Sequence, residues 1–321
     1  RVTAFAAVLV PPDIRTPEEV SQMRTAQNNL SAVRKLCSYL ASYDLNTELA
    51  GDRLKTRIAA MMPRLLGFDA ASCILALEDL GEASDFTSLY SGETLPESAL
   101  NQLADYLTNL HGAFAGALLD DVFSNRAMRE LNHQHIFDLP LREADLLDLD
   151  AITHGLRQTA QYLKNDRQYV ETVTRLGKLY LPEDAAVGIG KGVLLQGDFF
   201  PGSWLNTSAG VRVIDPEFCF VGPAEFDLGV MVAHLHLANQ PPSLVEKLLG
   251  RYSAPAGFAD GFDQKLMWQF AGIEIMRRLI GVAQLPLHYG IERKAELLKL
   301  SHELVLNESA QDLRKSGGVG H

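Results

Sequence analysis

Two short acidic segments carry the residue types that could do chemistry. The first reads Gln-Gly-Asp-Phe-Phe-Pro-Gly-Ser and holds Asp198 and Ser203, and the second reads Val-Ile-Asp-Pro-Glu-Phe and holds Asp215 and Glu217. Carboxylate and hydroxyl oxygens are the hard donors that Mg²⁺ prefers, and one or two carboxylates suffice because the ion keeps several waters. A further carboxylate can lie beside an attacking hydroxyl as its base. These are the groups that phosphoryl transfer from ATP requires of a protein.

Each acidic segment follows a short run that reads as a strand. Val193–Leu195 leads into Asp198, and Val211–Ile214 leads into Asp215 after a turn-forming stretch. In protein kinases the catalytic Asp lies five residues before a metal-binding Asn, and a metal-binding Asp follows on the next hairpin. Ser203 lies five residues after Asp198. The two segments therefore keep the register of a kinase catalytic loop and metal loop.

Hydrophobic periodicity predicts a mainly helical chain around these strands. In the clearest case, the leucines of 96–111 recur at three and four residues and form one amphipathic face. Residues 142–180 divide into two helices near Asn165-Asp166. The other predicted elements are a largely helical stretch over 17–60, a strand over 71–77, and helices over most of the chain after Pro223.

The composition is that of an ordinary globular protein and excludes several classes of partner. Of the 321 residues, 47% are hydrophobic and 21% are charged. The net charge of −11 disfavours nucleic acid, because an acidic surface repels phosphate backbones. No apolar stretch reaches the length of a membrane span, so we expect a cytoplasmic protein without a membrane partner. Cys37, Cys73 and Cys219 lack CxxC spacing, which argues against a disulfide framework or a zinc site.

The two acidic segments resemble the catalytic and metal loops of the aminoglycoside phosphotransferase and choline kinase superfamily. Within it, the methylthioribose kinases are the most similar, since they also carry Gly-Ser in the first loop and Asp-Pro-Glu-Phe in the second. The segment Leu-Glu-Asp-Leu at 77–80 is similar to their hinge, and the segment from Glu274 to Ala283 is similar to a C-terminal helix whose arginines face the sugar substrate. The resemblance covers residues 60 to 285.

The resemblance implies a role for each matching residue. Asp198 is the expected catalytic base. The expected Mg²⁺ ligands are Asp215 and Glu217, with Ser203 as a weaker oxygen ligand. The hinge is expected to offer backbone groups of its residues to the adenine of ATP, and two arginines are expected to contact the acceptor substrate; these residues are Glu78, Asp79, Leu80, Arg277 and Arg278.

The resemblance also implies an α/β (α+β), two-lobed protein-kinase-like fold. We expect an N-lobe over 1–77 that is small and either reduced or incomplete, a hinge over 78–81, a large helical C-lobe over 82–314 and a flexible tail over 315–321.

Three positions depart from the family pattern. Gln196 stands where the family has a loop His, and we interpret it as a structural residue. No glycine precedes Gly51, so a glycine-rich phosphate loop is missing from the stretch where it is expected. The lysine that should contact the α- and β-phosphates can be set only loosely against Gln27 or Lys35.

Three functions follow as hypotheses. The first is a phosphotransferase that uses ATP and Mg²⁺ to phosphorylate a hydroxyl of a small sugar-like molecule, methylthioribose-like or aminoglycoside-like. The second is a pseudokinase or a nucleotide- or small-molecule-binding module without turnover. The third is a phosphotransferase for another alcohol, such as a choline-like one, which would call for an aromatic cage. A homodimer is left open.

Other polar residues have plainer interpretations. Asp227 follows the metal loop in sequence and is interpreted as a carboxylate that caps the catalytic loop. The two histidine pairs are interpreted as packing residues rather than metal ligands; they are His133 with His135, and His234 with His236. The arginine pair could equally form salt bridges or clamp an anion or sugar.

Overall fold

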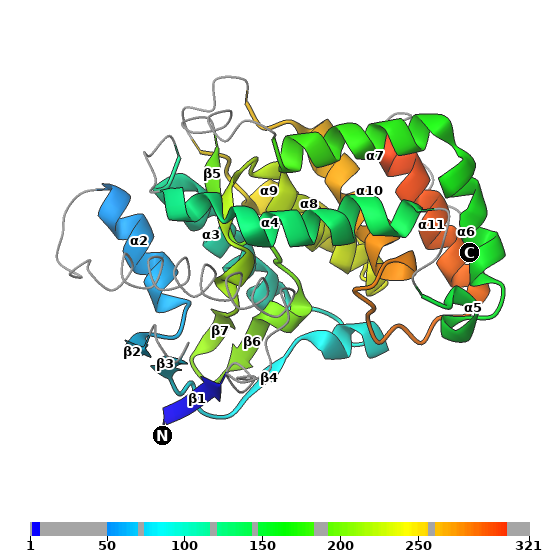
Figure 1. Cartoon of the computed structure of the whole chain (residues 1–321). Helices are drawn as coiled ribbons and strands as arrows, with labels where there is room; N and C mark the ends of the chain where they lie inside the picture. Colours follow the sequence, from blue (N-terminus) through cyan, green and yellow to red (C-terminus); the bar gives the residue numbers. More distant parts are fainter. Residues whose placement is uncertain are drawn as a thin grey trace, which may run out of the picture.

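The computed structural model describes residues 2–6, 50–69, 74–115, 121–142, 147–182, 192–255 and 261–306. A small part that contains a sheet precedes a large helical part, which confirms the predicted mixed fold class (Figure 1). The segment with Gln27 and Lys35, Cys37 and Cys73, and the predicted tail lie outside the described residues.

The small part is a three-stranded antiparallel sheet with one helix. Its strands are β1 (Val2–Ala6), β2 (Leu65–Asp69) and β3 (Ile74–Glu78), in the order β1-β3-β2. The pairing register of β2 with β3 shifts between Leu65 and Gly67. The strand predicted over 71–77 corresponds to β3. Helix α2 (Ala50–Ala60) is the described end of the helical stretch predicted over 17–60.

Two nested hairpins lie at the centre of the chain. Strand β5 (Val193–Leu195) pairs with β8 (Phe220–Gly222), and between them β6 (Trp204–Thr207) pairs with β7 (Gly210–Val213). The predicted catalytic loop connects β5 to β6, and the predicted metal loop connects β7 to β8. Because both pairs are antiparallel, the two loops must leave the hairpins side by side. Strand β4 (Ala83–Asp85) adds to the edge of β6.

Helices make up the rest of the described chain, as predicted. The predicted break near Asn165-Asp166 is confirmed, since the Asp166 side chain accepts the Tyr169 backbone N–H and caps α7. The elements are η1 (Thr87–Ser91), α3 (Glu97–Ala113), η2 (Asp121–Ser124), α4 (Arg126–His133), the π-helix η3 (Gln134–Asp138), η4 (Leu139–Leu141), α5 (Leu149–Ile152), α6 (Leu156–Asn165), α7 (Arg167–Tyr180), η5 (Pro201–Ser203), η6 (Pro216–Phe218), α8 (Glu225–Leu237), α9 (Pro242–Arg251), α10 (Gln264–Ile280) and α11 (Ile291–Leu306).

Helices α8 and α10 form the interior of the helical part. Nearly all of their side chains are buried, and α10 packs between α8 and α11 (Figure 1). A helix that is apolar on all sides is stable only inside a core. Apart from the exposed Lys265, the charged residues on these two helices are buried as well and must find partners there. No helix in the described ranges is long and apolar enough to cross a membrane.

Candidate active site

The catalytic loop turns sharply at Gly197. Its φ is +88°, and a Cβ atom there would lie 2.0 Å from the carbonyl oxygen of Phe218 in the metal loop. Only glycine permits both this backbone conformation and this approach of the two loops. The buried carboxylate of Asp227, at the start of α8, accepts the backbone N–H groups of Gln196 at 2.8 Å and Gly197 at 3.0 Å. The predicted capping role of Asp227 is confirmed.

Gln196 joins the catalytic loop to the metal loop. Its side-chain oxygen accepts the backbone N–H of Asp198 at 2.8 Å. Its amide nitrogen donates to the carbonyl oxygens of Ile214 at 3.2 Å and Asp215 at 3.1 Å. An amide side chain has both donors and an acceptor, so it can serve the two loops at once. This geometry agrees with the structural interpretation of Gln196.

The three predicted carboxylates lie close enough to influence one another. Burial, followed by the charges of Asp215 and Asp198, raises the pKa of Glu217 to about 7. The pKa of Asp215 is also raised, first by the protein that surrounds it and then by the charge of Asp198. Asp215 is nevertheless open to solvent on one side. The metal loop thus carries negative charge that the described residues do not neutralise.

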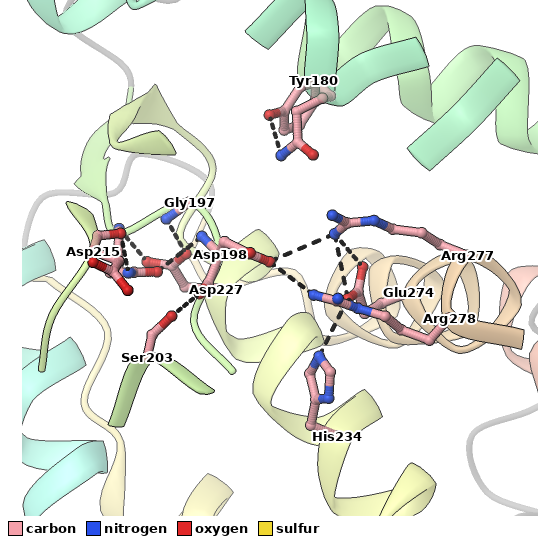
Figure 2. Close-up of polar contacts among 12 residues, drawn as sticks. Tyr180, Gly197, Asp198, Ser203, Asp215, Asp227, His234, Glu274, Arg277 and Arg278 are labelled. Carbon is pink, nitrogen blue, oxygen red and sulfur yellow. Dashed lines mark hydrogen bonds and ion pairs between the residues drawn. The ribbon is translucent and has the colours of Figure 1, made fainter. Parts of the chain in front are cut away.

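The structure positions Ser203 inside the catalytic loop. Its side chain is buried, and its hydroxyl donates to the carbonyl oxygen of Asp198 at 3.1 Å (Figure 2). Among the described residues, no group of three or more His, Cys, Asp and Glu side chains is arranged to hold a metal ion. The carboxylates therefore do not form a ready-made metal cage. The ring of His133 contacts that of Phe137.

A residue that the sequence analysis missed holds the metal loop from α4. The side-chain amide of Asn125 donates to the carbonyl oxygens of Glu217 at 2.8 Å and Cys219 at 2.9 Å. Asn125 is buried and has a positive φ of 42° at the residue before α4. A short polar residue before a helix is a weak sequence signal. Its partners lie more than 90 residues away, so no local pattern could have identified them.

Both arginines of α10 reach Asp198, the expected base. The guanidinium of Arg278 donates to Oδ1 of Asp198 at 3.0 Å, and that of Arg277 lies 3.6 Å from the same oxygen. Figure 2 shows Asp198 pointing toward this pair, while Asp215 lies on the neighbouring loop and away from the arginines. Of the two interpretations left open for the arginines, the salt-bridged one is observed, and it places them at the candidate active site.

A buried glutamate completes this charged group. Glu274 accepts Arg278 Nε at 2.5 Å and Arg277 Nη1 at 3.0 Å. Burial by itself would raise the pKa of Glu274, but the two guanidinium charges hold it well below its usual range. Burial likewise opposes the charge of Arg278, whereas the carboxylates of Glu274 and Asp198 raise its pKa. The negative charges of Glu274 and Asp198 therefore balance the positive charges of Arg277 and Arg278.

The predicted hinge residues lie where β3 meets β4. Glu78 ends β3, and its carboxylate pairs with Arg64 at 3.2 Å, a hydrogen bond that lowers its pKa. The backbone N–H of Glu78 also donates to Arg64, so any contact of Glu78 with adenine would come from its carbonyl group. Asp79 accepts the Gly81 backbone N–H at 2.9 Å, and Leu80 is half-buried.

Comparison with known proteins identifies relatives of one kind. A methylthioribose kinase of Exiguobacterium sibiricum is 28% identical over 218 residues, which cover 57% of this chain and 54% of that protein. One of Geobacillus thermodenitrificans is 25% identical over 298 residues, 78% of this chain and 72% of that protein. This chain is related in sequence to methylthioribose kinases. The resemblance predicted from the two loops is thereby confirmed, although the chain spans only about half the length of the first of these kinases.

The remaining matches cover less of the chain or are more distant in sequence and structure. A methylthioribose kinase of Geobacillus kaustophilus is 31% identical, over 42% of this chain and 39% of that protein. No family model matches the chain. Among solved structures, the AMP-bound spectinomycin phosphotransferase APH(9)-Ia has a TM-score of 0.45 at 13% identity and covers 88% of this chain and 84% of that one. Choline kinase LicA from Streptococcus pneumoniae has a TM-score of 0.39 at 12% identity, over 77% of this chain and 75% of that one.

Proposed function

We propose that this chain is an ATP- and Mg²⁺-dependent kinase that phosphorylates a hydroxyl group of a small sugar-like molecule. The observation that carries the proposal is the position of Asp198, which lies between the acidic metal loop and a buried arginine pair. The relatives named methylthioribose kinase support a methylthioribose-like acceptor, with an aminoglycoside-like sugar as the alternative. A choline-like cation is disfavoured because two guanidinium groups already lie beside Asp198.

The residues of the metal loop fit a Mg²⁺ ion. Burial and then the charges of Asp215 and Asp198 raise the pKa of Glu217, and a bound divalent cation would favour its ionised form. Asp215 and Glu217 would hold the ion, with Ser203 as a weaker ligand, and ATP phosphates and water would supply the other oxygens. When bound, the ion neutralises charge on the phosphates during transfer.

The protein's own residues supply the base and the orientation of the acceptor. Asp198 accepts the proton of the acceptor hydroxyl. Arg277 and Arg278 hold Asp198 in place, and Arg277 Nε is buried without a hydrogen-bond partner among the described residues. The backbone of Glu78, Asp79 and Leu80 would bind the adenine.

Release of ADP tests this proposal. Purified protein is incubated with ATP, Mg²⁺ and a panel of methylthioribose, aminoglycosides and amino alcohols. We expect Mg²⁺-dependent ADP release with a methylthioribose-like sugar, and a loss of rate in Asp198→Ala on the order of 10²-fold or more. Asp148→Ala, which removes an exposed carboxylate at the start of α5, should leave the rate unchanged. If no acceptor gives ADP above the Asp198→Ala background, the kinase proposal is wrong; ATP binding without turnover would then favour the binding module.

A further inference from the structure

Glu274 is a buried carboxylate that the proposed reaction does not use directly. It lies on α10, is only 1% exposed, and accepts hydrogen bonds from both arginines that reach Asp198. Burial of an ionised carboxylate is costly unless every lone pair is satisfied. The further hydrogen-bond partner of Glu274, beside the two arginines, therefore helps to hold its carboxylate in place.

That partner is His234 of α8, which is in turn held by Tyr90 of η1. The His234 Nε2 atom lies 3.2 Å from Glu274 Oε1, and the Nδ1 atom lies 2.6 Å from the Tyr90 hydroxyl (Figure 2 shows His234 beneath Glu274). Burial lowers the pKa of His234 to about 4 and raises that of Tyr90, so the imidazole is neutral and the phenol keeps its proton.

The direction of each hydrogen bond in this chain follows. An ionised Glu274 can only accept, so Nε2 of His234 must carry the ring proton. In a neutral imidazole Nδ1 is then an acceptor, and the Tyr90 O–H donates to it. The chain from Tyr90 to Glu274 therefore has one arrangement, which fixes the position of the Glu274 carboxylate.

Because of this position, the two N–H groups on one edge of the Arg278 guanidinium, the fork, donate to two different carboxylates. Its Nε donates to Glu274, whereas its Nη2 donates to Oδ1 of Asp198. Arginine pairs with a carboxylate most strongly when two N–H groups meet both oxygens. Glu274 occupies Nε and therefore excludes the side-on pairing, in which Nε and Nη2 would meet both oxygens of Asp198. The shortest contact of each arginine with Asp198 is to Oδ1, and the hydrogen bond from Arg278 goes to the same oxygen.

We propose that Glu274 is a positioning residue that keeps Arg278 from pairing side-on, through Nε and Nη2, with both oxygens of Asp198, and so leaves Oδ2 of Asp198 free for the acceptor hydroxyl. The role of Oδ2 rests on the proposed kinase function. The division of the Arg278 fork by Glu274 is a matter of geometry and can be tested without turnover.

The kinetic test uses Glu274→Gln, which keeps the shape of the side chain and removes its charge. We expect kcat to fall on the order of 10²-fold, the typical cost of a misplaced catalytic group, with KM for ATP unchanged. Glu225→Gln is the matched control, because Glu225 is a buried carboxylate of α8 that accepts the Asp263 backbone N–H instead. An equal loss of kcat in the two variants would overturn the proposal.

Tyr90→Phe is a milder variant that removes only the hydroxyl. The neutral His234 ring can then carry its proton on Nδ1 instead of Nε2, which turns an acceptor toward Glu274. We therefore expect kcat to fall, but by less than in Glu274→Gln, again with KM for ATP unchanged. An unchanged kcat in this variant counts against the chain of hydrogen bonds.

The structural test is a crystal structure of Glu274→Leu, because the amide oxygen of Gln could still accept the Arg278 Nε–H, whereas Leu removes both acceptor oxygens. We expect Arg278 to contact both oxygens of Asp198, and an Arg278 that keeps a single contact would refute the proposal even if kcat has fallen. If the wild-type protein phosphorylates no acceptor, the kinase proposal fails, and this structure still decides whether Glu274 divides the fork.

Discussion

At the scale of single residues, Asp215 combines an unusual backbone with an exposed carboxylate. Its φ of +54° is in the left-handed region, which Asp and Asn tolerate better than other residues that carry a Cβ. Such backbone strain concentrates at functional sites, where the surrounding structure enforces it. Burial, followed by the charge of Asp198, raises the pKa of Asp215. Both features suit a residue that is completed by a cation.

Asp215→Asn should therefore abolish Mg²⁺-dependent binding of ATP and leave the fold intact. Asn keeps the size of the side chain and its tolerance of a positive φ, but it removes the charge that a metal needs. The free energy of unfolding should be kept or slightly raised, because one carboxylate fewer lessens repulsion with Glu217 and Asp198. Calorimetry with ATP and Mg²⁺ measures the binding, and thermal melting measures the fold. Equal ATP affinity in the variant and the wild type would exclude this metal role.

At the scale of secondary structure, helix α8 contacts the candidate site at two places along its length. Its first turn presents Asp227 to the catalytic loop, and His234, two turns later, reaches Glu274. Because the helix is buried on all sides, its histidines are held in their neutral form. Burial lowers the pKa of His236 to about 4, as it does for His234, and the charge of Arg293 adds to the effect.

Acid should therefore destabilise the protein through these histidines. Between pH 6.5 and about 4 an unfolded histidine binds a proton that the folded one does not, so stability present above pH 6.5 is lost as the pH falls. Each histidine contributes a slope of at most about 1.4 kcal/mol per pH unit. His236→Gln should remove one such contribution from the pH dependence of the urea-unfolding free energy. The same slope in variant and wild type would contradict the predicted shift.

At the scale of the whole molecule, nested hairpins and two central helices assemble the site from distant parts of the chain. The β5–β8 and β6–β7 pairs bring the two loops together, and α10 brings the arginines from the C-terminal side. Asn125 and Tyr90 contribute from the segments between β4 and α4. Ligand binding to such a site should stabilise the folded state as a whole.

Addition of ATP with Mg²⁺ should accordingly raise the melting temperature. At a ligand concentration of about 100 Kd the expected stabilisation is about 2.7 kcal/mol. Asp215→Asn is the control and should show no shift, because it lacks the proposed metal ligand. A wild-type melting temperature that does not respond to ATP and Mg²⁺ would count against both the kinase and the nucleotide-binding module.

The sequence by itself determined the features that depend on neighbouring residues. The strand runs before Asp198 and Asp215 and the helical periodicity of 96–111 appear in the structure as predicted. These are local properties, since turn residues and side-chain periodicity act within a few positions. The role of Asp227 as a cap was also within reach, because a carboxylate at the start of a buried helix needs donors close by.

Only the tertiary structure decided which distant groups pair. Asp198 and Arg278 are 80 residues apart, Asn125 and Glu217 are 92 apart, and Tyr90 and His234 are 144 apart. A buried charge must find a partner, but its own sequence neighbourhood does not say which one. The choice is made by the packing of α8, α10 and the two hairpins, which places one carboxylate on each side of the arginine pair. For that reason the sequence left the role of the arginines open, and the fold resolved it.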